Sequence, residues 1–265
     1  MRESRPRSAE PPRPARWRLS AAVLFVYSVI LLLLLATGPI ARAAPSTGRV
    51  VAVFLPTTVT PAALERQLES GLGPGVDVLV YGRFSDFASA IRGQSPNAIL
   101  TSATVLDALS LPTHVQGVRG GQVTEQWLLV SVGDTLDRVA PEQVRYGALD
   151  MVGREGLPTL VARLLGLSRR PQVVRVVKYA DLLPVLQFGE ADAVLVPQRI
   201  LDDFTSKSRL RFRVERVSTA RIKRPGVSFT GPERHDIASR LRHLDPAVRE
   251  LLGVDGWVEP RGGQP

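Results

Sequence analysis

Residues 173 to 197 read VVRVVKYADLLPVLQFGEADAVLVP, and residues 76 to 102 read VDVLVYGRFSDFASAIRGQSPNAILTS. Placing Asp181 on Asp86 aligns the apolar positions of the two segments. Each has the pattern of an apolar strand, a turn with an acidic N-cap candidate, a short helix and a second apolar strand. The sequence therefore predicts one βαβ unit that occurs twice, which indicates two similar lobes. Because βαβ units are common, a chance likeness is the alternative.

Strand and helix patterns also alternate along the rest of the chain. Arg49 to Leu55 is a nearly continuous apolar run, typical of a strand buried in a parallel sheet. Thr60 followed by Pro61 marks a helix start, with leucines at every fourth position after it. Gln126 to Val132 and Leu210 to Val217 are further predicted strands. This alternation predicts an α/β fold of two lobes, with mostly parallel sheets flanked by helices.

We expect the chain to pass between the lobes twice, around residues 132–138 and 216–224, and so to form a two-strand hinge. The expected divisions are a signal peptide or N-terminal membrane anchor (1–44), the first part of lobe one (45–134), lobe two (135–218), the C-terminal part of lobe one (219–258) and a disordered tail (259–265).

The first 44 residues have the composition of an export signal. Arginines before residue 19 precede an uncharged apolar run, Leu19 to Ala36, and Ala41-Arg42-Ala43 has the spacing of a cleavage site. An uncleaved anchor is the alternative, since a run of about 18 residues reaches the lower limit of a membrane span. In both cases we expect a periplasmic or otherwise extracytoplasmic protein.

Charge and cysteine content narrow the functional classes. The formal charge is +9, but residues 1–43 hold seven arginines and two glutamates, so the remainder carries +4. The basic composition therefore does not indicate a nucleic-acid partner. The chain has no cysteine, so the exported part folds without disulfides.

Several stretches resemble a known family. They are the two repeated segments, the run VAVFLPTT (51–58), the strand QWLLVSVGD (126–134) and the motif GEADA (189–193). Together they resemble the type 2 periplasmic binding proteins, and within these the phosphate/phosphite/phosphonate group of ABC-transporter substrate-binding proteins. The resemblance implies a monomer whose lobes close on a small anionic molecule and which is recognised by an ABC permease or a membrane sensor.

The chain departs from that group at residues 150–156. Phosphonate binders commonly place Ser and Thr at the first helix of the second lobe, whereas this stretch reads DMVGREG. The difference leaves two alternatives to a phosphonate-like ligand: a different ligand, or a sensory or accessory domain that acts through a protein partner.

Ligands of open α/β sheets bind beyond the carboxyl ends of the strands. This rule selects as candidate ligand-binding residues Thr57, Thr58, Tyr81, Arg83, Thr101, Ser102, Thr104, Arg154, Lys178, Tyr179, Gln198 and Arg199.

The hydroxyls and the arginines in this set could each have a structural role in place of a ligand-binding role. The hydroxyls of residues 101–104 stand at a predicted helix start, where backbone N–H groups favour an anion, although one of them alone would serve as a cap. Arg154 and Arg199 oppose the helix dipole, which an anionic ligand would offset. Local ion pairs with neighbouring Asp or Glu are the alternative. We expect lobe one to supply hydroxyls and lobe two positive charge.

Nothing in the sequence indicates an enzyme. It has no cysteine, no G-x-S-x-G turn and no glycine-rich phosphate loop. His114, His235 and His243 are scattered and lack a carboxylate cluster with metal spacing. We therefore expect binding without catalysis, metal or cofactor. The arginines of residues 234–249 are interpreted as a solvated helix face, with a docking face as the alternative.

Overall fold

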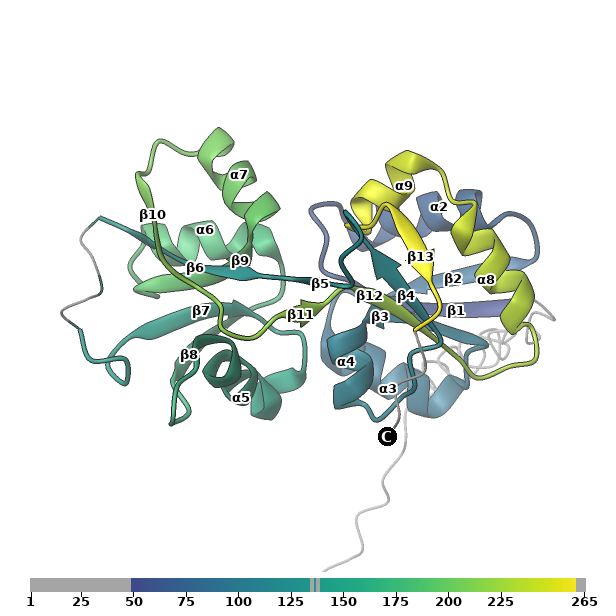
Figure 1. Ribbon diagram of the computed structural model, residues 1–265, viewed down its shortest axis with the longest axis horizontal. Helices are drawn as coiled ribbons and strands as arrows, with labels where there is room; N and C mark the ends of the chain where they lie inside the picture. The colour runs from purple at the N-terminus through teal and green to yellow at the C-terminus, as the bar shows by residue number, and fades with distance from the viewer. Residues whose placement is uncertain (1–48, 134–135, 137–138, 261–265) are drawn as a thin grey trace, which may run out of the picture. The chain divides into compact units, whose positions relative to one another are not determined.

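A computed structural model describes residues 49–133, 136 and 139–260, which form two α/β lobes joined by a pair of short strands (Figure 1). The expected export signal at residues 1–44 lies outside the described residues. So do residues 261–265 of the expected tail.

Lobe one is built on a six-stranded mixed sheet with the order β13-β4-β12-β3-β1-β2. Its elements are β1 (Arg49–Phe54), α2 (Pro61–Leu72), β2 (Val76–Val80), α3 (Phe84–Gln94), β3 (Ala98–Ser102), α4 (Ala103–Ala108), β4 (Val115–Val118), β12 (Pro225–Phe229), α8 (Arg234–Arg242), α9 (Pro246–Leu251) and β13 (Gly256–Val258). Strands β1, β2 and β3 are parallel, and β12 lies antiparallel between β3 and β4.

Lobe two is built on a five-stranded sheet with the order β10-β6-β9-β7-β8. Its elements are β6 (Trp127–Val132), β7 (Arg145–Leu149), α5 (Gly153–Leu165), β8 (Gln172–Val176), α6 (Tyr179–Gln187), β9 (Ala193–Pro197), α7 (Gln198–Lys207) and β10 (Phe212–Val217). Strand β7 pairs in parallel with β8 and β9, whereas β6 is antiparallel to its neighbours β9 and β10.

Two short antiparallel strands, β5 (Thr124–Glu125) and β11 (Ile222–Lys223), carry the chain between the lobes. The first crossing therefore lies before the expected residues 132–138, because β6 pairs with β9 and belongs to lobe two. Only Gln126 separates β5 from β6, so the sequence has no turn that would mark the crossing. The return crossing lies at β11.

The repeated unit is visible in both topology and hydrogen bonds. The strand orders β2-β1-β3 and β8-β7-β9 are equivalent. The Asn97 side chain accepts a hydrogen bond from Val50 N (2.8 Å), and Asp192 accepts one from Arg145 N (2.8 Å). Asp192 lies 95 positions after Asn97, and Arg145 lies 95 positions after Val50. One alignment thus holds from the first to the third strand of each lobe.

Helix starts explain one local difference from the sequence-based expectation. Thr60 caps α2 as predicted, accepting a hydrogen bond from Ala63 N. The expected acidic caps of α3 and α6 are wrong, because Asp86 and Asp181 lie in the first turn of their helices. The N-cap positions hold Arg83 and Lys178, neither of which forms a side-chain capping bond. The carboxylates still favour the helices, since negative charge is stabilising near an N-terminus.

Most of the arginines of the C-terminal helices contact their own chain. Arg240 bonds to Asp236 and to the carbonyl of Leu72, and Arg242 pairs with Glu259 at 3.0 Å. These contacts tie α8 to lobe one. No helix within the described part of the chain is both long and apolar enough to cross a membrane.

Candidate functional site

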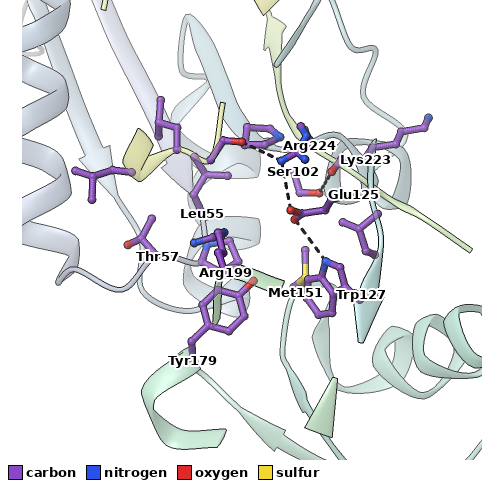
Figure 2. A pocket seen from close by; sticks show the side chains of 16 residues that line it. Leu55, Thr57, Ser102, Glu125, Trp127, Met151, Tyr179, Arg199, Lys223 and Arg224 are labelled. Atoms are coloured by element: carbon purple, nitrogen blue, oxygen red, sulfur yellow. Dashed lines mark hydrogen bonds and ion pairs between the residues drawn. The ribbon is translucent and has the colours of Figure 1, made fainter. Parts of the chain in front are cut away.

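A small cavity lies where the carboxyl ends of strands from both lobes meet the hinge strands (Figure 2). Its volume is about 30 Å³. We call it the hinge cavity, and it is lined by Leu55, Pro56, Thr57, Ser102, Glu125, Trp127, Met151, Tyr179, Arg199, Ile222, Lys223, Arg224, Pro225, Leu251, Leu252 and Gly253.

A larger cavity of about 150 Å³, which we call the apolar cavity, adjoins it. Its lining is Phe54, Leu55, Pro56, Thr57, Thr58, Val59, Thr60, Pro61, Leu64, Val80, Tyr81, Gly82, Leu149, Val177, Lys178, Tyr179, Ala180, Asp203 and Lys207. Four lining residues are common to both cavities: Leu55, Pro56, Thr57 and Tyr179. One ligand can therefore touch both.

Arg199, in the first turn of α7, is the notable charge of the hinge cavity. Its guanidinium carbon lies 5.6 Å from the centre of the Tyr179 ring, in a cation–π arrangement visible in Figure 2. Its Nε atom is buried and has no hydrogen-bond partner. No carboxylate of the described residues forms an ion pair with it. A buried polar atom without a partner is costly, so an anion that reached this group would be stabilised.

Tyr179 separates the two cavities and is itself almost fully buried, at 3% exposure. Burial raises the pKa of its phenol, while the nearby Arg199 charge opposes that rise and Glu125 adds to it. The phenol is therefore neutral at physiological pH. Its ring also packs against Trp127, with the ring centres 6.4 Å apart. This aromatic pair fixes the position of the ring over which Arg199 lies.

Glu125 and Arg224 form the other charged group of the hinge cavity. Arg224 Nη1 lies 3.3 Å from Glu125 Oε2 and donates a hydrogen bond to the carbonyl of Gly253. The other oxygen of Glu125 accepts a hydrogen bond from Trp127 Nε1 (3.4 Å). Burial lowers the pKa of Arg224, the charges of Arg119 and Arg199 lower it further, and Glu125 opposes them. Arg224 stays protonated, and its charge is compensated by Glu125, whereas no carboxylate among the described residues pairs with Arg199.

Solved structures with the same architecture exist at low sequence identity. The binding-protein component of an ABC phosphonate transporter from Pseudomonas aeruginosa aligns with a TM-score of 0.59 at 10% identity, over 80% of this chain and 82% of its own. A protein from Xanthomonas citri bound to ATP gives 0.57 at 12% identity, over 80% and 92%. A mutant of ArgBP from T. maritima gives 0.52 at 14% identity, over 77% and 96%.

The fold is that of the two-lobed periplasmic binding proteins. At these identities the likeness extends to the fold alone. No protein-family model matches the sequence, and no curated protein matches it.

The hydroxyls of Thr101, Ser102 and Thr104 in lobe one already form hydrogen bonds within the chain. Thr101 Oγ1 donates to the carbonyl of Phe54 (2.6 Å), and Ser102 Oγ donates to the carbonyl of Lys223 (2.8 Å). Thr104 Oγ1 accepts from Lys223 N (3.0 Å). Ser102 also caps α4 by accepting from Thr104 N. Of these three, only Ser102 lines a cavity, and its hydroxyl holds the hinge strand β11.

The other predicted site residues fall into two groups. Those that line the two cavities, besides Ser102, are Thr57, Thr58, Tyr81, Lys178, Tyr179 and Arg199. Those that line neither cavity, besides Thr101 and Thr104, are Arg83, Arg154 and Gln198. Arg83 lines a separate surface hollow, and Arg154 is exposed on α5. Gln198 lines a hollow of about 550 Å³ that shares Glu125, Arg199 and Arg224 with the hinge cavity. Gln198 donates to Asp202 (2.8 Å). Of the two predicted first-turn arginines, Arg199 therefore lines the hinge cavity and Arg154 lines neither cavity.

Sequence reasoning missed the hinge side of the site. Met151 lies in the stretch 150–156, where the strand-end rule selected Arg154 instead. Glu125, Trp127, Arg224 and Gly253 come from three other segments, and none of them follows a predicted strand with an obvious polar turn. The one usable signal was Glu125, a carboxylate two residues before a tryptophan at the start of an apolar strand. Arg224 had no local signal, because its position depends on the return crossing.

Proposed function

We propose that this chain is an exported solute-binding protein that closes its lobes on a small anionic solute and presents it to an ABC-type permease. The observation that carries the proposal is Arg199, whose guanidinium pairs with no carboxylate of the described residues and lines a cavity formed by both lobes. Hydrogen bonds between a guanidinium and an anion are shorter and stronger than neutral ones. A bound anion would supply the partner that residues 49–133, 136 and 139–260 do not provide.

The fold supports a binding role in place of a catalytic one. The Pseudomonas aeruginosa structure is by its title the binding component of an ABC phosphonate transporter. A solute held between two lobes stabilises the closed arrangement, and a membrane partner can distinguish the two arrangements. The hinge strands β5 and β11 provide the two connections that such a motion needs.

The experiment is a thermal-shift and calorimetric screen of the full chain against inorganic phosphate, phosphonates, sulfonates and carboxylates. A solute present at 100 times its dissociation constant should stabilise the folded state by about 2.7 kcal/mol. Arg199→Met should then raise the dissociation constant of the best anion roughly 10- to 100-fold, because hydrogen bonds to charged groups contribute about 1.5–3 kcal/mol.

Arg154→Met is the matched control, since Arg154 also lies in the first turn of its helix but is exposed and away from both cavities. Its affinity for the same anion should remain within twofold of the unmodified chain. If no anion shifts the melting temperature, or if both variants weaken binding equally, the proposed site is refuted.

A further inference from the structure

We propose that the solute is an organic monocarboxylate that carries an apolar group about the size of a benzene ring and no ammonium group. This inference rests on the proposed function and narrows it to one class of solute. Three features carry it: the volume and lining of the apolar cavity, the number of unpaired charges in the hinge cavity, and the state of the carboxylates near both.

The apolar cavity sets the body of the solute. Side chains of Phe54, Leu64, Val80, Leu149 and Val177 contribute to its walls. Its volume of about 150 Å³ compares with dry cavities of about 150 Å³ that accept benzene in other proteins. An inorganic anion would leave this volume unfilled by any apolar group, and so would forgo its hydrophobic contribution.

The connection between the cavities sets where the apolar body joins the acidic group. Leu55 and Thr57 line both cavities from lobe one, and Tyr179 lines both from lobe two. Arg199 lies beside Tyr179 on the hinge side, as Figure 2 shows. A solute whose acidic group meets Arg199 therefore passes Tyr179 and directs its other end into the apolar cavity.

Charge matching selects a single negative charge. Arg224 is neutralised by Glu125, and Lys223 by Asp107 at 2.7 Å. Arg199 is left as the cation of the hinge cavity without an acidic partner among the described residues. Lys178 also lines the apolar cavity but is exposed, so its charge does not require a partner.

The single unpaired guanidinium selects the acidic group. A carboxylate carries one charge at neutral pH, and its two oxygens match the guanidinium fork with two parallel hydrogen bonds. A phosphate-type group carries a second charge for part of the time at that pH, and the hinge cavity offers no second unpaired cation among the described residues.

Neighbouring carboxylates disfavour an ammonium group on the solute. Glu125 is the carboxylate that lines the hinge cavity, and both of its oxygens are engaged, by Trp127 and Arg224. Asp203, which lines the apolar cavity, is paired with Lys207 at 2.7 Å. An α-amino acid would therefore bring an ammonium group to a site that has no free acceptor charge for it.

The test is titration calorimetry of the full chain with phenylacetate, acetate, inorganic phosphate and L-phenylalanine. We expect phenylacetate to bind at least tenfold more tightly than each of the other three. Phenylacetate and acetate differ in the apolar group, so this comparison tests the apolar cavity. L-phenylalanine differs from phenylacetate by an ammonium group and one additional carbon, so this comparison tests mainly the ammonium group.

Ala180→Trp and Gln187→Trp form a matched pair of variants on α6. Ala180 lines the apolar cavity, whereas Gln187 is exposed at the far end of the helix and lines neither cavity. We expect Ala180→Trp to reduce the preference for phenylacetate over acetate to less than threefold. Gln187→Trp should preserve the preference of the unmodified chain.

The outcomes separate this inference from the proposed function. If phosphate or acetate binds as tightly as phenylacetate, and Arg199→Met abolishes that binding, the inference is overturned and the proposed function stands. Tighter binding of L-phenylalanine than of phenylacetate would likewise overturn the inference. If none of the anions binds, the proposed function fails, and the inference fails with it.

Discussion

The two lobes use one scaffold for different chemistry. The 95-residue shift that places Asn97 on Asp192 also places Thr104 on Arg199, in the first turns of α4 and α7. Thr104 accepts a hydrogen bond from Lys223 N of the hinge strand, whereas Arg199 lines the hinge cavity and pairs with no acidic residue in the part of the chain that the structure describes. The comparison shows that the repeated unit fixes where a side chain lies, while the residue type decides whether it serves the hinge or a ligand.

Charge is divided unequally between the lobes. Residues 126–221 carry 15 Lys and Arg against 11 Asp and Glu, whereas residues 47–125 with 222–260 carry 11 against 12. The positive charge of the chain after residue 43 is therefore concentrated in lobe two. An anion in the cleft would be attracted mainly by that lobe, at a range limited by salt screening.

Truncating a core side chain at equivalent positions of the two lobes should have the largest effect on the free energy of unfolding. The shift of 95 places Phe87 on Leu182, and both side chains are 0% exposed. We expect Phe87→Ala to lower the free energy of unfolding by about 3–5 kcal/mol and Leu182→Ala by about 2–5 kcal/mol. Urea denaturation measures both, with Gln187→Ala as the exposed control. A loss below about 1 kcal/mol at either site would break the equivalence of the lobes.

Glu125→Gln should give lobe one an unpaired cation to match that of lobe two. The change removes the partner of Arg224, whose side chain is only 13% exposed, so we expect the free energy of unfolding to fall by about 1–3 kcal/mol. With two unpaired guanidinium groups the hinge cavity should bind phosphate several-fold more tightly. Glu155→Gln, on the exposed side of α5, is the control. Unchanged stability and unchanged phosphate affinity would show that the pair is not coupled to the cavity.

Asp192→Asn makes lobe two resemble lobe one at the hydrogen bond between the third and first strands, where lobe one has Asn97. Asn would keep the bond to Arg145 N but lose the ion pair with the Arg145 guanidinium (2.7 Å), for about 1 kcal/mol or less because the pair is partly exposed. The Arg145 hydrogen bond holds the pKa of Asp192 below its usual value. The stabilisation is therefore present above the unfolded pKa of about 3.9 and is lost as pH falls through the lower folded value.

The measurement is denaturation of both proteins between neutral pH and the acid limit of folding. The stability difference between the unmodified chain and Asp192→Asn should shrink as the pH drops below about 4. A difference that stays constant down to the acid limit would mean that Asp192 contributes no ion-pair stabilisation. Asn97→Asp provides the opposite change, since it would place a carboxylate beside Glu233, to which Asn97 donates at 3.1 Å.

Ser102→Ala should have the smallest effect on binding. Its buried hydroxyl donates to the carbonyl of Lys223 and caps α4 by accepting from Thr104 N, so we expect a stability loss of about 1 kcal/mol. Affinity for any bound anion should change less than twofold. An affinity loss of tenfold or more would mean that the Ser102 hydroxyl contacts the anion, in line with the expectation that lobe one supplies hydroxyls.

Local patterns were sufficient for the repeated unit and insufficient for the strands around it. The apolar runs of β1, β3, β7 and β9 and the Thr60 cap of α2 are properties of short segments, so the sequence predicts them. Strands β4 and β13 were missed because they are four and three residues long and include glycines. Their stability comes from pairing with β12 and with each other across large sequence distances.

The site was predictable where it follows the strand-end rule. Tyr179 and Arg199 follow strands of lobe two, as the rule expects, and both line the hinge cavity. It also selected Arg154, because it cannot tell which face of a helix a first-turn residue occupies. It missed Glu125 and Arg224 because the hinge strands are two residues long and are fixed only by their mutual pairing. Which hydroxyls are free likewise depends on tertiary contacts.

The position of strand β12 determines the order in which the two lobes can finish folding during synthesis. It fills the place between β3 and β4, and β4 pairs with β12 and β13, both of which are made more than a hundred residues later. Figure 1 shows the yellow C-terminal elements lying among blue ones of the same lobe. At ~5–20 residues per second, a ribosome needs roughly 5–20 s to reach β12 after β4. Lobe two, whose strands are contiguous in sequence, is complete before then. The lobe that is begun first is the one that is finished last.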